Sequence, residues 1–249
     1  MGNFNKFIKA STELDKLAGH ILSEVKPCKT KRQQYMVMAV NKIFNLFKSI
    51  KMLDSNGYLR EAAQLVRSQI ELQFVTQYVF QDKTDKRLEK YLDYYNVYRK
   101  KLYDNLKAND LELELFKTFK DILIGEKFTE EDIQKYAESA QLKHHYPRHG
   151  WSNKSLYQMI DETNGMEFYR HYYYLYSEAI HSSIANLYEY FPSHQKGESN
   201  MYLLMTNTMV SFLTCILIFQ RFCKEFKLPM INEVEDLMER LGLEIERDL

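Results

Sequence analysis

Two pairs of polar residues interrupt helical stretches of this chain that are otherwise largely apolar or aromatic. Arg67 and Glu71 are four residues apart, and so are Ser177 and His181. Residues at this spacing share one face of an α-helix. A guanidinium can bind phosphate and stabilise developing negative charge, and an imidazole can exchange protons near neutral pH. The spacing therefore marks Arg67, Glu71 and His181 as candidate catalytic residues. His181 would act as general acid or base, and Arg67, oriented by Glu71, would stabilise the charge of a phosphorane.

The same residues have a purely structural interpretation. A buried arginine must be paired, and Glu71 is its nearest candidate partner, followed by His181 or a tyrosine hydroxyl. Such a cluster would hold two core helices together without doing chemistry. Both interpretations place Arg67, Glu71 and His181 close together in the fold.

A loop centred on Pro147 supplies a second set of candidates. Three histidines, His144, His145 and His149, fall within six residues and could converge on zinc. No cysteine or acidic residue is close to them in the sequence, so we expect neither a metal nor another cofactor. Arg148 and Trp151 are candidate contacts if this loop closes over a cleft, and a plain surface loop is the alternative.

Composition indicates helices and argues against some partners. The chain has 249 residues, with only four prolines and eight glycines, and this scarcity of breakers favours long helices. We expect an all-α fold, one domain over 1–249, with about eight to ten helices around an apolar central helix. Formal net charge is zero, which argues against a broad basic face for duplex DNA. Three cysteines without a Cys-x-x-Cys pair, and no signal-peptide pattern at the start, predict a cytoplasmic protein with reduced thiols.

Hydrophobic periodicity and breakers locate the elements that must position the candidate residues. The third and eighth predicted helices carry the two polar pairs, and 228–249 forms a C-terminal amphipathic segment. The predicted helices are 4–25, 30–53, 58–81, 83–109, 111–124, 129–141, 152–161, 166–190, 200–227 and 231–246.

The most apolar stretch, 201–219, carries no charge and is long enough to raise the question of a membrane span. Polar residues interrupt it at five positions, so we expect a buried central helix and no membrane association. These residues are Thr206, Asn207, Thr208, Ser211 and Thr214.

Three short blocks resemble the signature of a bacterial all-helical family of unknown function, over roughly residues 35–225. They are Leu65-Val66-Arg67-Ser68-Gln69-Ile70-Glu71, Trp151-Ser152-Asn153-Lys154-Ser155-Leu156 and Tyr176-Ser177-Glu178-Ala179-Ile180-His181-Ser182. The resemblance implies a fold and a candidate site. It adds Ser68, Lys154 and Ser177 to Arg148 and Trp151 as candidate binding residues.

A more distant likeness is to HEPN helical domains, which include ribonucleases of phage-defence and toxin systems. Those domains carry an arginine, then four to six intervening residues, then a histidine on one helix, and two copies meet across a dimer. Here Arg170 precedes His181 by eleven residues, about three helical turns, so Arg67 would have to replace it. This likeness implies a metal-independent ribonuclease that acts on RNA.

The alternative is a non-enzymatic helical module that binds a protein or a small ligand, in the form of a homodimer. The small residues of 177–183 or the apolar 201–219 helix could form the subunit interface. The sequence leaves open whether the protein is an enzyme.

Overall fold

The computed structural model describes residues 2–25, 27–108, 129–147, 150–173, 176–177 and 197–242. Within these ranges it has nine α-helices and one π-helical turn and no strand, which confirms the all-α prediction. The predicted helix over 111–124 lies outside the described residues. Contacts group the chain into two compact units, which we call the first unit (1–81 with 156–249) and the second unit (82–155). The expectation of one domain over 1–249 stays a prediction.

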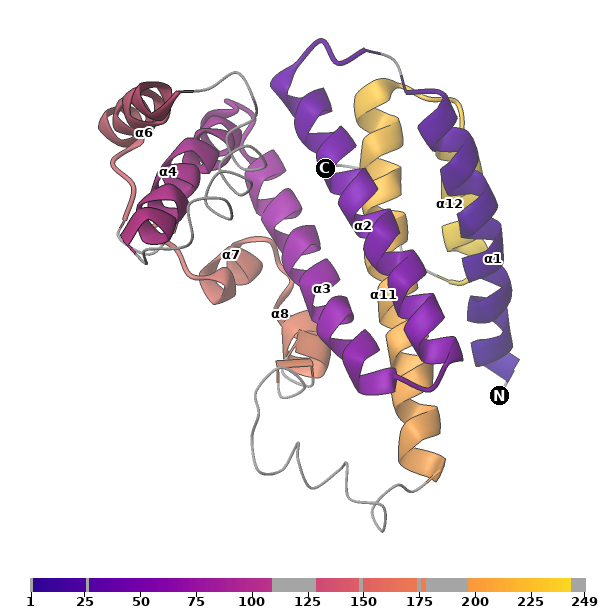
Figure 1. Ribbon diagram of the computed structural model, residues 1–249. Coiled ribbons are helices and arrows are strands. Elements are labelled where there is room, and N and C mark those ends of the chain that lie inside the picture. Colours follow the sequence, from indigo (N-terminus) through magenta and orange to yellow (C-terminus); the bar gives the residue numbers. More distant parts are fainter. Residues whose placement is uncertain are drawn as a thin grey trace. The chain divides into compact units, whose positions relative to one another are not determined.

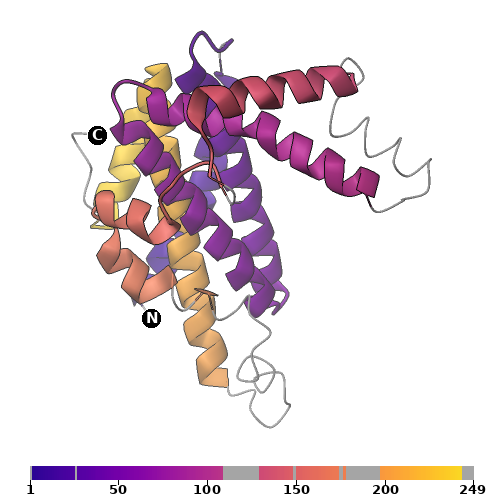
Figure 2. The same cartoon turned by 90° about the vertical axis from the view of Figure 1, so that its left-hand side faces the viewer.

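The first unit is a helical bundle built around α11 (Gly197–Phe226). This helix packs against α1 (Gly2–Ser23), α2 (Lys31–Ser55), α3 (Leu59–Gln81) and α12 (Ile231–Arg240). Figures 1 and 2 show α2, α3 and α11 running side by side along the bundle. Three phenylalanines of α11 are completely buried, and the predicted apolar central helix is confirmed; they are Phe212, Phe219 and Phe222.

The Met201–Phe226 part of α11 is long and apolar enough to cross a membrane, judged by length and composition alone. The core helix of a soluble protein passes the same test, and 56% of the most apolar window of α11 is buried inside the first unit. Two of its inward polar side chains have protein partners: Thr214 Oγ1 donates to the Val210 carbonyl (3.0 Å), and Asn207 donates across to Asp54 of α2. The absence of a membrane span stays a prediction.

The start of α2 and the turn to α3 follow local signals that the sequence contains. Thr30 caps α2 by accepting a hydrogen bond from the Gln33 N–H (3.1 Å). Asn56 and Gly57 end the helix, and Gly57 has a φ of +82°, a conformation that glycine adopts without steric cost. The predicted boundaries of both helices are therefore within two residues of those observed.

The region predicted as one helix over 166–190 is more irregular in its described part. After α7 (Leu156–Glu162) and a turn, α8 (Met166–Phe168) leads into the π-helical turn η1 (Tyr169–Tyr173). Within η1 the rings of Tyr169 and Tyr173 stack with centroids 4.8 Å apart. Residues 178–190 lie outside the described part of the chain.

The second unit consists of α4 (Lys86–Ala108) packed against α6 (Glu130–His144). A capping box starts α6: Thr129 accepts from the Asp132 N–H, and the Asp132 carboxylate accepts from the Thr129 N–H. The predicted end at 141 was too early by three residues. Helical bonding continues until His145 adopts a left-handed φ of 49° and donates its N–H to the Gln141 carbonyl.

Candidate functional site

Arg67, Glu71 and Tyr173 form a closed three-membered contact, which we call the Arg67 cluster. Successive turns of α3 carry Arg67 and Glu71, and Arg67 Nε donates to Glu71 Oε1 at 3.0 Å. Arg67 Nη2 donates to Tyr173 Oη at 3.0 Å, and Tyr173 Oη donates to the same Glu71 oxygen at 3.0 Å. The guanidinium carbon also lies 5.0 Å from the Tyr173 ring centroid. Three interlocking contacts therefore hold Arg67 in one orientation.

Partial burial and mutual pairing shift the pKa values of the cluster and so determine its protonation states. The side chain of Arg67 is 19% exposed and that of Glu71 is 41% exposed. Burial opposes the charge on Arg67, but Tyr173 and Glu71 outweigh it and raise the pKa of the guanidinium above its ordinary value. Burial, reinforced by Glu71, also raises the pKa of Tyr173, so its phenol stays protonated and able to donate.

The cluster leaves hydrogen-bonding capacity unused. A guanidinium has five N–H donors, and two of those of Arg67 are engaged by other described residues. Glu71 Oε2 has no partner among the described residues. Tyr173 lies in a π-helical turn, a feature found frequently at functional sites. The arrangement can bind an anion through the remaining edge of Arg67.

The structure brings together some predicted site residues of the first unit. Arg67 and Glu71 pair as predicted, and the tyrosine hydroxyl considered as an alternative partner is that of Tyr173. Ser68 Oγ donates to the Gln64 carbonyl (3.4 Å), and Ser177 Oγ donates to the Tyr173 carbonyl (2.8 Å). His181 lies outside the described residues. Tyr173 could have been identified from its spacing, four residues before Ser177.

Of the predicted binding residues of the second unit, Trp151 lies in a packed aromatic region. Trp151 contacts Tyr91 edge to face with ring centroids 4.9 Å apart, and it packs against the small core around Val97 and Tyr146. The Lys154 backbone N–H donates to Ser152 Oγ at 3.1 Å. Arg148, like His149, lies outside the described residues. Trp151 therefore has a packing role, and its binding role stays a prediction.

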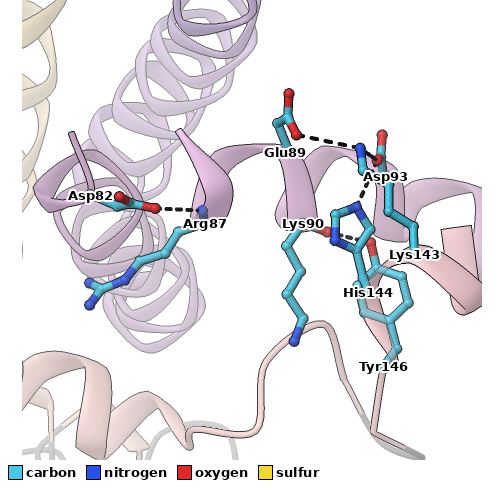
Figure 3. A network of polar contacts seen from close by, with 8 residues as sticks. All are labelled: Asp82, Arg87, Glu89, Lys90, Asp93, Lys143, His144 and Tyr146. Carbon is cyan, nitrogen blue, oxygen red and sulfur yellow. Dashed lines mark hydrogen bonds and ion pairs between the residues drawn. The ribbon is translucent and has the colours of Figure 1, made fainter. Parts of the chain in front are cut away.

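The histidine-rich segment begins in the last turn of α6 and is tied to α4 (Figure 3). His144 Nε2 lies 2.8 Å from Asp93 Oδ2, and Lys143 Nζ lies 3.1 Å from the same oxygen. Burial would raise the pKa of Asp93, but hydrogen bonds from His144 and Lys143 outweigh it and lower that pKa below its ordinary value. Tyr146 Oη donates to the Lys90 carbonyl at 2.6 Å. Among the described residues, no three histidine, cysteine or acidic side chains gather as metal ligands would.

A buried polar contact in the first unit was not anticipated from the sequence. Asn207 Nδ2 donates to Asp54 Oδ1 (2.9 Å) and to the Leu59 carbonyl (2.8 Å). Burial raises the pKa of Asp54 to about 7, although the bond from Asn207 acts against it. Asn207 Oδ1 and Tyr176 Oη are buried without a hydrogen-bond partner in the described part of the chain. The only sequence signal for this contact was the uncharged polar residue Asn207 within an apolar helix.

The fold and the site together define an all-α protein in which a partly buried arginine and glutamate of α3 contact a buried tyrosine of η1. Residues 33–199 match the family of unknown function DUF5677, and the chain belongs to this family. The resemblance to an all-helical family of unknown function is thereby confirmed. The match starts two residues before the predicted 35 and ends at 199, short of the predicted 225. It includes the Arg67 cluster, Trp151 and His181. No curated protein and no solved structure matches the chain significantly.

Proposed function

We propose that this protein is a metal-independent ribonuclease that uses Arg67 to bind the scissile phosphate. The supporting observation is that the Arg67 guanidinium donates a hydrogen bond of 3.0 Å to Glu71 and another of 3.0 Å to Tyr173. Its other N–H groups have no partner among the described residues. A preorganised cation of this kind stabilises charge that develops on phosphate oxygens, because it needs no reorientation during the reaction.

The expected reaction is transesterification within the RNA chain. A base takes the proton of a ribose 2′-hydroxyl, and the 2′-oxygen attacks the adjacent phosphorus. The bond from phosphorus to the 5′-oxygen breaks, and an acid protonates that oxygen. The products are a 2′,3′-cyclic phosphate and a 5′-hydroxyl. Arg67 stabilises the phosphorane oxygens, and Glu71 orients Arg67.

His181 is the proposed acid or base, on the basis of its sequence position. Tyr173, Ser177 and His181 follow one another at intervals of four residues, which predicts that they share one helical face. In the described part of this segment, Ser177 Oγ donates a hydrogen bond of 2.8 Å to the Tyr173 carbonyl, a contact that spans one helical turn. A HEPN-like, cytoplasmic effector of phage defence would use such an activity to stop translation in its own cell.

The purified protein should cleave single-stranded RNA in the presence of EDTA and leave cyclic phosphate ends. Arg67→Lys should lower the cleavage rate constant about 100-fold or more, because lysine cannot reproduce the bonds to Glu71 and Tyr173.

His181→Ala should also lower the cleavage rate constant by about 100-fold or more. Expression of the wild type, but not of Arg67→Lys, should arrest bacterial growth.

The matched control is Arg240→Lys, because Arg240 also pairs with a glutamate, Glu13, but is 60% exposed on α12. This variant should cleave RNA at the wild-type rate. Absence of cleavage by the wild type, or equal cleavage by wild type and His181→Ala, would contradict the proposal.

A homodimeric binding module is the second candidate function. Large apolar side chains are exposed at the α2–α3 connection and in α11 near its start: Met52 (61%), Tyr58 (58%), Met201 (48%) and Tyr202 (65%). Exposed apolar residues favour an interface where they form a contiguous patch. Light scattering at micromolar concentration should give the mass of a dimer, and Tyr202→Glu should shift the protein towards monomer. A monomeric wild type would remove this candidate.

A further inference from the structure

A cavity of about 240 Å³ lies among α2, α3 and α11 in the first unit. It is lined by Arg32 at the start of α2, by Gln73 and Gln77 of α3, and by Arg221 and Lys224 of α11. None of these residues belongs to the Arg67 cluster. The cavity is slightly smaller than the range of about 300–1,000 Å³ that is typical of drug-sized ligands, so it suits a small metabolite.

Two arginines on the same aromatic ring give this cavity its positive character. The guanidinium carbon of Arg32 lies 4.9 Å from the Phe80 ring centroid, and that of Arg221 lies 5.2 Å from it. The two guanidinium carbons are therefore within about 10 Å of each other. Stacking on a ring holds a guanidinium in place while its N–H edge faces sideways. With Lys224, the wall carries three cations against the one carboxylate of Glu225.

Two carboxamides add neutral hydrogen-bonding groups to the same wall. Gln73 is only 6% exposed, and its Oε1 is buried with no hydrogen-bond partner in the described part of the chain. Gln77 Oε1 is also buried with no hydrogen-bond partner in the described part of the chain. Rotation about the last side-chain bond presents either the oxygen or the nitrogen of a carboxamide to the cavity. A ligand that carries hydroxyl groups would provide donors for these oxygens.

We propose that this cavity binds a small sugar phosphate. The phosphate would be held by Arg32, Arg221 and Lys224, because a guanidinium can donate two parallel hydrogen bonds to two oxygens of one phosphate. The sugar hydroxyls would bond to Gln73 and Gln77. The described residues that line the cavity include no histidine, cysteine or hydroxyl side chain, and the proposal is one of ligand binding.

Isothermal titration calorimetry with ribose 5-phosphate, inorganic phosphate and ribose tests the proposal. Ribose 5-phosphate should bind more tightly than inorganic phosphate, and ribose should not bind at about 1 mM. Arg221→Gln should weaken ribose 5-phosphate binding about tenfold or more. Gln77→Met should weaken it about fivefold and leave the binding of inorganic phosphate unchanged.

Arg240→Gln is the control for loss of a positive charge elsewhere in the first unit, and it should bind ribose 5-phosphate as the wild type does. Circular dichroism establishes that each variant is folded. Because the Gln77 side chain is only partly buried, Gln77→Met gives a second, milder substitution. No binding of ribose 5-phosphate by the wild type would overturn the proposal. So would equal affinity for inorganic phosphate, or an equal loss in Arg240→Gln.

Discussion

Asp54→Asn should increase the free energy of unfolding at pH 8 by up to about 4 kcal/mol and change it little at pH 4. Burial raises the pKa of Asp54 from 3.8 to about 7. Each unit of pKa difference between native and unfolded states corresponds to about 1.4 kcal/mol. Asparagine occupies a similar volume, accepts the same hydrogen bond from Asn207, and never ionises.

The direction of the pH dependence follows from proton binding. Well below pH 3.8 the carboxyl is protonated in both states and carries no penalty. Between pH 4 and pH 7 the unfolded chain loses this proton while the native state keeps it, so wild-type stability falls as pH rises. Above pH 7 the native state must hold a buried charge, and the whole penalty applies. The free energy of unfolding of Asp54→Asn should not fall in this way as pH rises.

Urea denaturation of wild type and Asp54→Asn at pH 4, 6 and 8 measures the effect. Asp236→Asn is a matched control, because Asp236 is exposed on α12, and it should show no comparable rise with pH. A stability difference for Asp54→Asn that is the same at pH 4 and pH 8 would show that Asp54 titrates normally in the folded protein.

Gly165→Ala should destabilise the first unit by about 3 kcal/mol, through overpacking. A Cβ at position 165 would lie 3.0 Å or less from three carbons of the Phe74 ring. Phe74 is 4% exposed and packs edge to face on Phe168, so the ring has little room to move. The φ of Gly165 is −88°, which alanine adopts easily, so the expected loss comes from contact and not from backbone strain.

A double-mutant cycle with Phe74→Leu tests this explanation. The smaller leucine leaves space for the new methyl group, so the two substitutions together should cost less than the sum of their separate effects. Gly19→Ala is the control: nothing lies within 4 Å of its added Cβ, and alanine in this helix should stabilise by up to about 1 kcal/mol. Additive effects of Gly165→Ala and Phe74→Leu would show that the ring contact is not the cause.

The Asn164–Gly165 pair shows how far local sequence patterns reach. The sequence predicted a helix break here, and the break is present, but Asn164 is the residue that adopts the left-handed conformation, with a φ of 56°. Gly165 is required for another reason, the close approach of Phe74 from α3. No local pattern can reveal that requirement, because the two residues are far apart in the chain and meet only when α3 packs against this segment.

The sequence by itself determined the features that depend on neighbouring residues. Helix periodicity located α2, α3 and α11, and spacing paired Arg67 with Glu71. These features are local because helical faces and caps involve residues within one or two turns.

Only the tertiary structure decided which residue completes each polar contact. Tyr173, 106 residues from Arg67, closes the Arg67 cluster, and Asn207, 153 residues from Asp54, holds the buried carboxyl. The physical reason is that contacts between helices depend on how their faces cross and interlock in packing. Helical periodicity indicates which face is inward, but not which side chain of another helix lies opposite it.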